Sequence, residues 1–71
     1  MNTIEKRFRV NRKSIGFLKF IIEAYEGMAV VTTRNAQSGE ISIFIAPGCE
    51  HDIDELIAEL GKTIFIQPLT I

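Results

Sequence analysis

Ser14–Gly27, S-I-G-F-L-K-F-I-I-E-A-Y-E-G, is the stretch of sequence that decides the fold. Its apolar residues recur at the three- and four-residue spacing of one helix face: Leu18, Ile21, Ile22 and Tyr25. The charged residues fall on the other side: Lys19, Glu23 and Glu26. We expect the Ser14 hydroxyl to cap the start of this helix and Gly27 to end it in a left-handed conformation. The stretch is therefore predicted to form a helix that packs one face on a core.

Strand-like runs lie on both sides of this helix. Residues 4–10 alternate between a mainly apolar set and a charged set, namely Ile4, Lys6, Phe8 and Val10 against Glu5, Arg7 and Arg9. Residues 28–34 are rich in β-branched side chains, and residues 40–46 place isoleucine at every second position. The N-A-Q-S-G segment between them, residues 35–39, is typical of a hairpin turn. The sequence predicts one strand before the helix and an antiparallel hairpin after it.

A second helix and a last strand complete the chain. Ile53, Leu56, Ile57 and Leu60 share one helix face, and Gly61 is expected to end that helix. Acidic residues fill its first turns, where they complement the positive end of the helix dipole. Residues 63–67 follow as a strand, and Pro68 favours an edge position for it. Residues 64–66 are all apolar, so the pattern does not decide which face of this strand is buried.

The predicted order is therefore strand, helix, strand, strand, helix, strand. At this length the order favours an α+β fold, the ferredoxin-like βαββαβ sandwich, with an antiparallel sheet in the order 4-1-3-2 and two helices on one face. Residues 1–71 are expected to form a single domain of this kind.

Composition limits the function further. The 71 residues carry a formal net charge of −1, so attraction to nucleic acid would need a local basic patch. The single cysteine cannot form an internal disulfide and suits a reducing cytoplasm. No segment has the roughly 18 to 20 consecutive apolar residues of a membrane-spanning helix. We therefore predict a cytoplasmic protein. Because so short a chain buries only a small core, we also predict that it forms a homodimer.

Two resemblances follow from the motifs. The run K-S-I-G-F-L-K-F-I-I-E-A-Y-E-G-M-A-V-V-T-T, followed by I-A-P-G before an acidic helix, resembles a family of short bacterial proteins of unassigned function. The helix start is more distantly similar to ACT-type regulatory domains, in which a P-G-x-L turn leads into the first helix. Gly16 and Leu18 match that turn, whereas Ile15 stands where proline is usual. The ACT resemblance implies sheet-mediated pairing and, in some members, a small amino acid bound at the pairing surface.

The start of the first helix is the candidate ligand site. Free amide N–H groups at a helix start, together with two basic side chains, can hold a carboxylate or a phosphate. The residues concerned are Arg12, Lys13, Ser14, Ile15 and Gly16. The alternative interpretation is a capped helix start preceded by solvated basic residues.

The sheet face opposite the helices is the second candidate surface. If the isoleucines face inward, two aromatic and two basic side chains point outward: Arg7, Arg9, Phe44 and Phe65. A second copy or another protein could cover this face. RNA binding is less favoured, because the first strand carries arginines where an RNA-recognition fold has an aromatic residue.

Catalytic and metal sites are not indicated. Cys49 and His51 lie together at the start of the second helix, but two such ligands are too few for structural zinc. No histidine lies near Ser14 in sequence to activate it. We therefore predict no enzyme, no metal and no cofactor. The prediction is a binding or regulatory module that senses an amino acid or another small anion; the alternative is a protein-interaction subunit without a ligand.

Overall fold

Four strands and two main helices follow one another in the predicted order. The computed structural model describes residues 3–25 and 27–70. Its elements are β1 (Ile4–Val10), the 3-10 helix η1 (Arg12–Ser14), α1 (Ile15–Glu23), β2 (Ala29–Asn35), β3 (Glu40–Ile45), α2 (Glu50–Leu60) and β4 (Ile66–Leu69).

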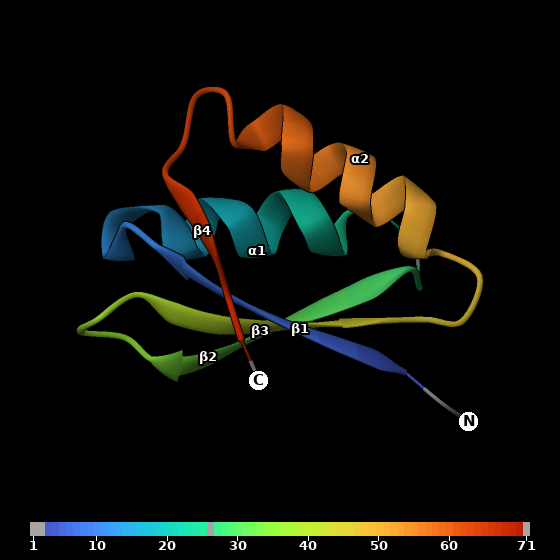
Figure 1. The fold of residues 1–71 in the computed structure, drawn as a ribbon, viewed down its shortest axis with the longest axis horizontal. Coiled ribbons are helices and arrows are strands. Elements are labelled where there is room, and N and C mark those ends of the chain that lie inside the picture. Colours follow the sequence, from blue (N-terminus) through green and yellow to red (C-terminus); the bar gives the residue numbers. More distant parts are fainter. Residues whose placement is uncertain (1–2, 26, 71) are drawn as a thin grey trace.

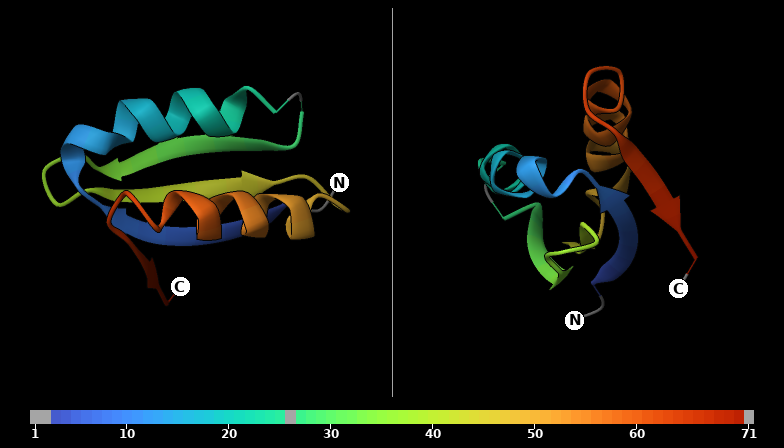
Figure 2. Two further views of the ribbon diagram at one scale, coloured as in Figure 1. Left: turned by 90° about the horizontal axis from the view of Figure 1, so that it is seen from above. Right: turned by 90° about the vertical axis from the view of Figure 1, so that its left-hand side faces the viewer.

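The strands form one antiparallel sheet in the order β2-β3-β1-β4, which is the predicted order read from its other edge. Both helices cover the same face of this sheet, with α1 over the β2 side and α2 over the β1 side (Figure 1, Figure 2). The predicted ferredoxin-like α+β fold is confirmed.

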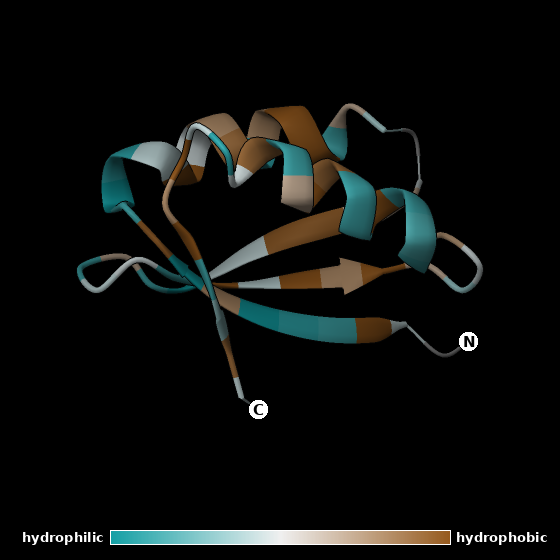
Figure 3. Cartoon of the chain, turned by 45° about the horizontal axis from the view of Figure 1, so that its top comes forward, coloured by the Kyte–Doolittle hydropathy of each residue, from teal (hydrophilic) through white to brown (hydrophobic). Residues whose placement is uncertain are grey.

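The core lies between the sheet and the helices, as the period-two pattern of the strands requires. Three strands and both main helices contribute residues that are less than a tenth exposed: Phe8 and Val10 from β1, Ala29 and Val31 from β2, three isoleucines from β3, Leu18 and Ile22 from α1, and Ile53 from α2. Figure 3 shows hydrophobic residues concentrated in α1 and the strands beneath it, with hydrophilic residues along much of β1 and α2.

Lys6 joins β1 to α2 within the helix layer. Its Nζ donates to Asp54 Oδ1 at 2.9 Å and lies 3.5 Å from Glu50 Oε2. The hydrogen bond to Asp54 raises the pKa of Lys6 above its ordinary value. Lys6 lies on the otherwise apolar face of β1, and its charge is therefore balanced by the acidic residues at the start of α2.

The hairpin turn packs against the end of β1. Asn35 Oδ1 accepts from the N–H groups of Gln37 at 3.0 Å and Ser38 at 3.2 Å, which folds the turn back on itself. Gly39 then adopts φ +78°, and its carbonyl accepts from Val10 N–H at 2.8 Å. A side chain at Gly39 would collide with the Val10 carbonyl oxygen. Only glycine fits this junction.

The start of the first helix differs from the prediction. Ser14 makes no side-chain capping hydrogen bond. Instead, the Asn11 side chain accepts from Lys13 N–H at 3.1 Å and the Asn11 carbonyl accepts from Ser14 N–H at 2.8 Å. The helical turn thus begins three residues earlier, as η1, and Asn11 is the capping residue.

The end of the first helix differs from the prediction, and the end of the second agrees with it. Helix α1 ends at Glu23, so Tyr25 lies beyond it and is 40% exposed rather than on the core face. Gly27 does adopt the expected left-handed conformation, with φ +68°. Helix α2 ends at Leu60 and Gly61 is its capping residue, with φ −64°, so the predicted end of the second helix is confirmed. The Leu60 carbonyl accepts from the N–H groups of Thr63 and Ile64, which extends the turn beyond α2.

The last strand is consequently displaced. It runs from Ile66 to Leu69 instead of residues 63–67, because residues 61–64 continue the turn. Pro68 lies opposite Phe8 on this edge strand, so the predicted edge position is confirmed. Ile64 and Ile66 pack against the core, whereas Phe65 is 59% exposed. Within residues 3–25 and 27–70, no helix combines the length and the apolar character needed to cross a membrane.

Candidate functional site

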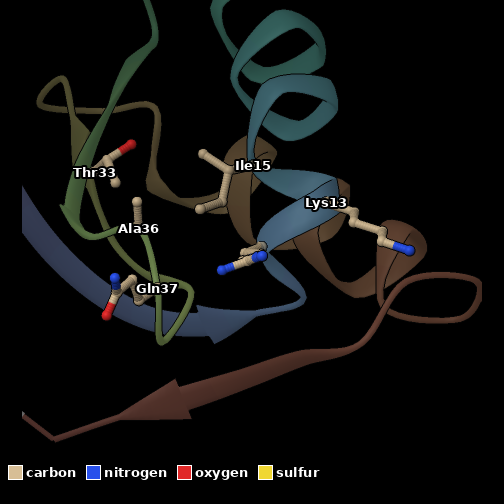
Figure 4. A pocket seen from close by; sticks show the side chains of 6 residues that line it. Lys13, Ile15, Thr33, Ala36 and Gln37 are labelled. Carbon is tan, nitrogen blue, oxygen red and sulfur yellow. The ribbon is translucent and has the colours of Figure 1, made fainter.

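A cavity of about 480 Å³ opens between the start of the first helix and the β2–β3 hairpin (Figure 4). We call it the hairpin cavity. It is lined by Arg12, Lys13, Ile15, Thr33, Ala36 and Gln37. Its volume lies within the range of small-molecule sites.

Local chain geometry brings these residues together. The Asn11 cap and η1 turn the chain sharply after β1, which places Arg12 and Lys13 above the end of the sheet. The β2–β3 register shifts between Thr33 and Asn35, and the turn stabilised by Asn35 then carries Ala36 and Gln37 toward the helix start. The cavity therefore lies where two turns meet.

Apolar and polar groups line different parts of the cavity. In Figure 4 the Ile15 side chain points toward Thr33 and Ala36, while the amino group of Lys13 points away from all three hairpin residues. The remaining polar residues of the lining are Arg12, Thr33 and Gln37. A guanidinium, a hydroxyl and an amide beside two apolar side chains can hold a carboxylate that carries a short apolar group.

Arg12 and Lys13 also differ from the other basic residues in their pairing. The other six each lie within 4.0 Å of a carboxylate oxygen: Lys6, Arg7, Arg9, Lys19, Arg34 and Lys62. Among the described carboxylates, none pairs with Arg12 or Lys13. Among the groups that the structure describes, the basic side chains without a carboxylate partner are thus the two beside the hairpin cavity.

The backbone amides of the helix start are less free than the sequence suggested. Lys13 N–H donates to Asn11 Oδ1, Ser14 N–H to the Asn11 carbonyl, and Ile15 N–H to the Arg12 carbonyl. Since these donors are used internally, an anion here would be bound chiefly by side chains.

The structure brings together part of the predicted ligand set. Arg12, Lys13 and Ile15 line the cavity, whereas Ser14 and Gly16 do not. Thr33, Ala36 and Gln37 were missed, because no local pattern in the sequence shows that the hairpin turn packs beside the helix start.

The open face of the sheet carries a charge network centred on Glu5. Glu5 Oε2 accepts from Ser42 Oγ at 2.7 Å, Arg34 Nη2 at 3.0 Å and Arg7 Nε at 3.2 Å. The Ser42 hydroxyl, followed by the two arginines, lowers the pKa of Glu5 from 4.5 to about 2. Arg34 Nε also donates to Ser42 Oγ at 2.8 Å, and the guanidinium carbon lies 5.7 Å from the centre of the Phe44 ring. Ser42 is completely buried beneath this network.

Of the four residues predicted to point outward, Arg7, Arg9 and Phe44 lie on this face of β1 and β3, and Phe65 lies just before β4. Phe44 pairs with Glu5 near one end of β1, while Phe65 immediately precedes Ile66, the partner of Val10 at the other end. Arg7 is paired with Glu5, and Arg9 Nη2 lies 3.8 Å from Glu40 Oε2. The sheet face is thus mainly a network of paired charges.

A second hollow, which we call the acidic cleft, lies between α2 and the segment that follows α1. Its volume is about 360 Å³, and it is lined by Tyr25, Met28, Asp52, Glu55, Leu56 and Glu59. His51 Nε2 lies 3.2 Å from Glu55 Oε1, and Cys49 packs partly against the core. In the part of the chain that the structure describes, no three histidine, cysteine or acidic residues are grouped to hold a metal ion.

Fold and cavity together define a small ferredoxin-like domain with a mixed polar and apolar hollow at the first helix start. Residues 8–64 match the family described as "Domain of unknown function (DUF4911)", and the chain belongs to that family. The matched range includes all six residues of the hairpin cavity. No curated protein and no solved structure matches the chain. The predicted relation to a family of unassigned function is confirmed, and the ACT-type similarity stays a prediction.

Proposed function

We propose that this protein is a non-enzymatic binding module that holds a small carboxylate, such as an amino acid, in the hairpin cavity. The observation that carries the proposal is the position of Arg12, which lines the cavity and has no partner among the described carboxylates. A guanidinium can bind a carboxylate through two parallel hydrogen bonds. Ile15 and Ala36 offer an apolar surface for the rest of the ligand.

Thr33 and Gln37 supply the polar groups that would orient the ligand. Both belong to the hairpin, while Arg12 and Ile15 belong to the helix start. A ligand that contacts both sides would tie the hairpin to the first helix. Binding would therefore stabilise the folded state and reduce motion between these two parts, which suits a regulatory module.

The proposal is tested first by thermal unfolding of the purified protein with millimolar amino acids, small carboxylates and nucleotides. A ligand at about a hundred times its dissociation constant stabilises the folded state by roughly 2.7 kcal/mol. We expect stabilisation by one class of carboxylate. Amide chemical shifts in the NMR spectrum should then change at Thr33, Ala36 and Gln37.

Two matched variants locate the binding site. Arg12→Gln should abolish binding, whereas Lys13→Gln should retain most of it, because the Lys13 amino group points away from the hairpin residues (Figure 4). Absence of stabilisation across the whole panel would contradict the proposal. So would a ligand whose affinity is unchanged in Arg12→Gln.

A further inference from the structure

The outer surface of α1 is apolar although it faces solvent. Phe17 is 50% exposed and Phe20 is 73% exposed, while Leu18 and Ile22 on the opposite side are buried in the core. Ala24 is also exposed. A helix that is apolar on both sides is typical of one that is covered on both sides. We call Lys13, Phe17, Phe20 and Ala24, which follow one another at intervals of four, three and four residues, the outer stripe.

The outer stripe is large enough to form the centre of an interface. If each phenylalanine presents about 200 Å², the exposed parts of the two rings alone amount to roughly 250 Å². A standard interface needs about 800 Å² from each partner, so these rings would supply nearly a third of it. Aromatic residues at the centre, with charged residues at the margin, are typical of such surfaces.

The surface beside the outer stripe is acidic. Helix α2 runs alongside α1 and stands farther from the sheet (Figure 1, Figure 2). Its flank contributes Asp52, Glu55 and Glu59 to the acidic cleft, which also contains Tyr25 and Met28 from the segment between α1 and β2. A partner segment that fits here must be apolar along its centre and basic at the end that reaches the acidic cleft.

The outer stripe itself is apolar along its centre, at Phe17 and Phe20, and basic at one end, at Lys13. We propose that a second copy of this chain docks on α1, so that the two α1 helices pack antiparallel around a two-fold axis near Phe20. Residues 17 and 24 are equally distant from a centre between residues 20 and 21, so each Phe17 ring would lie over the partner's Ala24. Large side chains then meet small ones, as helix packing requires.

Charge complementarity supports the same arrangement. In an antiparallel pair, the Lys13 end of one α1 lies beside the Tyr25 end of the other, where the acidic cleft opens. Lys13 is exposed and has no partner among the described carboxylates of its own chain. Two symmetric contacts between Lys13 and the partner's acidic flank would fix the direction of the pair. Lys13 borders both the hairpin cavity and the outer stripe, and its amino group points away from the hairpin residues (Figure 4).

Sedimentation equilibrium from micromolar to millimolar concentration tests the proposal. We expect a concentration-dependent dimer. Phe20→Glu should weaken it at least about 100-fold, since it places a charge at the centre of the interface. Phe65→Glu alters another exposed phenylalanine, 59% exposed and outside α1, and should leave the dimer unchanged. Circular dichroism and thermal unfolding check that both variants remain folded.

A charge exchange tests the direction of the pair. Lys13→Glu should weaken the dimer about tenfold, and adding Asp52→Lys and Glu55→Lys in the same chain should restore it. A wild-type chain that stays monomeric at millimolar concentration would overturn the proposal and assign the outer stripe to a different partner. Dissociation by Phe65→Glu but not Phe20→Glu would overturn it as well. Failure of the exchange to restore affinity would overturn the antiparallel arrangement.

Discussion

Glu23 on α1 accepts a hydrogen bond from the backbone N–H of Val31 on β2, with 3.0 Å between Oε2 and the nitrogen. Lys19 completes the contact: its Nζ donates to the Val31 carbonyl at 3.2 Å and to Glu23 Oε2 at 3.1 Å. Since β2 is an edge strand, these two side chains occupy backbone groups that would otherwise be open to another strand. The Val31 hydrogen bond, followed by that of Lys19, lowers the pKa of Glu23.

The first prediction is that Glu23→Ala opens the β2 edge. The Val31 N–H loses its acceptor, so its hydrogen exchange should become markedly faster, the melting temperature should fall, and the variant should aggregate more readily on warming. Amide exchange measured by NMR gives the direct test. Glu59→Ala is the matched control, because Glu59 on α2 and its partner Lys62, just beyond the helix, both have side chains that are 72% exposed. Unchanged exchange at Val31 in Glu23→Ala would contradict this role.

The second prediction compares three glycines. Gly39→Ala should cost roughly 3 kcal/mol or more, because the residue has φ +78° and its new side chain would meet the Val10 carbonyl. Gly27→Ala, with φ +68° and open space around it, should cost about 1–2 kcal/mol. Gly16 lies in α1, and a Cβ added there would have no neighbouring side chain or other element within 4 Å. Gly16→Ala should therefore stabilise the folded protein by about 0.5–1 kcal/mol. Urea unfolding measures all three, and a Gly39→Ala cost no greater than that of Gly27→Ala would contradict the packing argument.

The overall fold could be predicted because each element carries a local pattern. Alternation in β1 and β3 assigned Phe8 and Ile43 to the core side, and the order of elements allowed one compact topology. The predicted ends of the helices and strands were less accurate, because they depend on which backbone N–H donates to which carbonyl. The Leu60 carbonyl accepts hydrogen bonds from two backbone amides, so β4 begins later in the chain than predicted. No pattern of residues in the sequence indicates these two hydrogen bonds.

The candidate site was predicted in part for a similar reason. Arg12 and Lys13 stand out as a basic pair before a helix, and composition alone draws attention to them. The other wall of the hairpin cavity comes from residues more than 15 positions away, whose approach depends on the β2–β3 register shift. The charge network around Glu5 was also missed, because Arg34 reaches Glu5 across β3.

The third prediction separates two candidate capping residues. Asn11→Ala should destabilise the protein by about 1 kcal/mol, because the Asn11 side chain accepts from Lys13 N–H. Ser14→Ala should change stability little, since Ser14 makes no capping hydrogen bond. Chemical denaturation of both variants decides between them. A larger loss in Ser14→Ala than in Asn11→Ala would restore the capping role that the sequence suggested for Ser14.

The fourth prediction concerns stability in acid. The pKa of Glu5 is about 2 in the folded protein against an ordinary value of 4.5, so between these values the unfolded chain binds a proton that the folded chain does not. The stabilisation by Glu5 is therefore fully present above about pH 4.5 and is lost as the pH falls toward about 2. The urea midpoint of the wild type should decline through this window.

Glu5→Gln tests the origin of this decline. Glutamine keeps the shape of the side chain but cannot ionise, so the variant should be less stable than the wild type at neutral pH and should lose less stability on acidification. Glu23 also has a lowered pKa, so some dependence on pH should remain. Glu59→Gln, on the exposed flank of α2, is the control and should follow the wild type. If Glu5→Gln declined in parallel with the wild type, the acid sensitivity would have to come from carboxylates outside the Glu5 network.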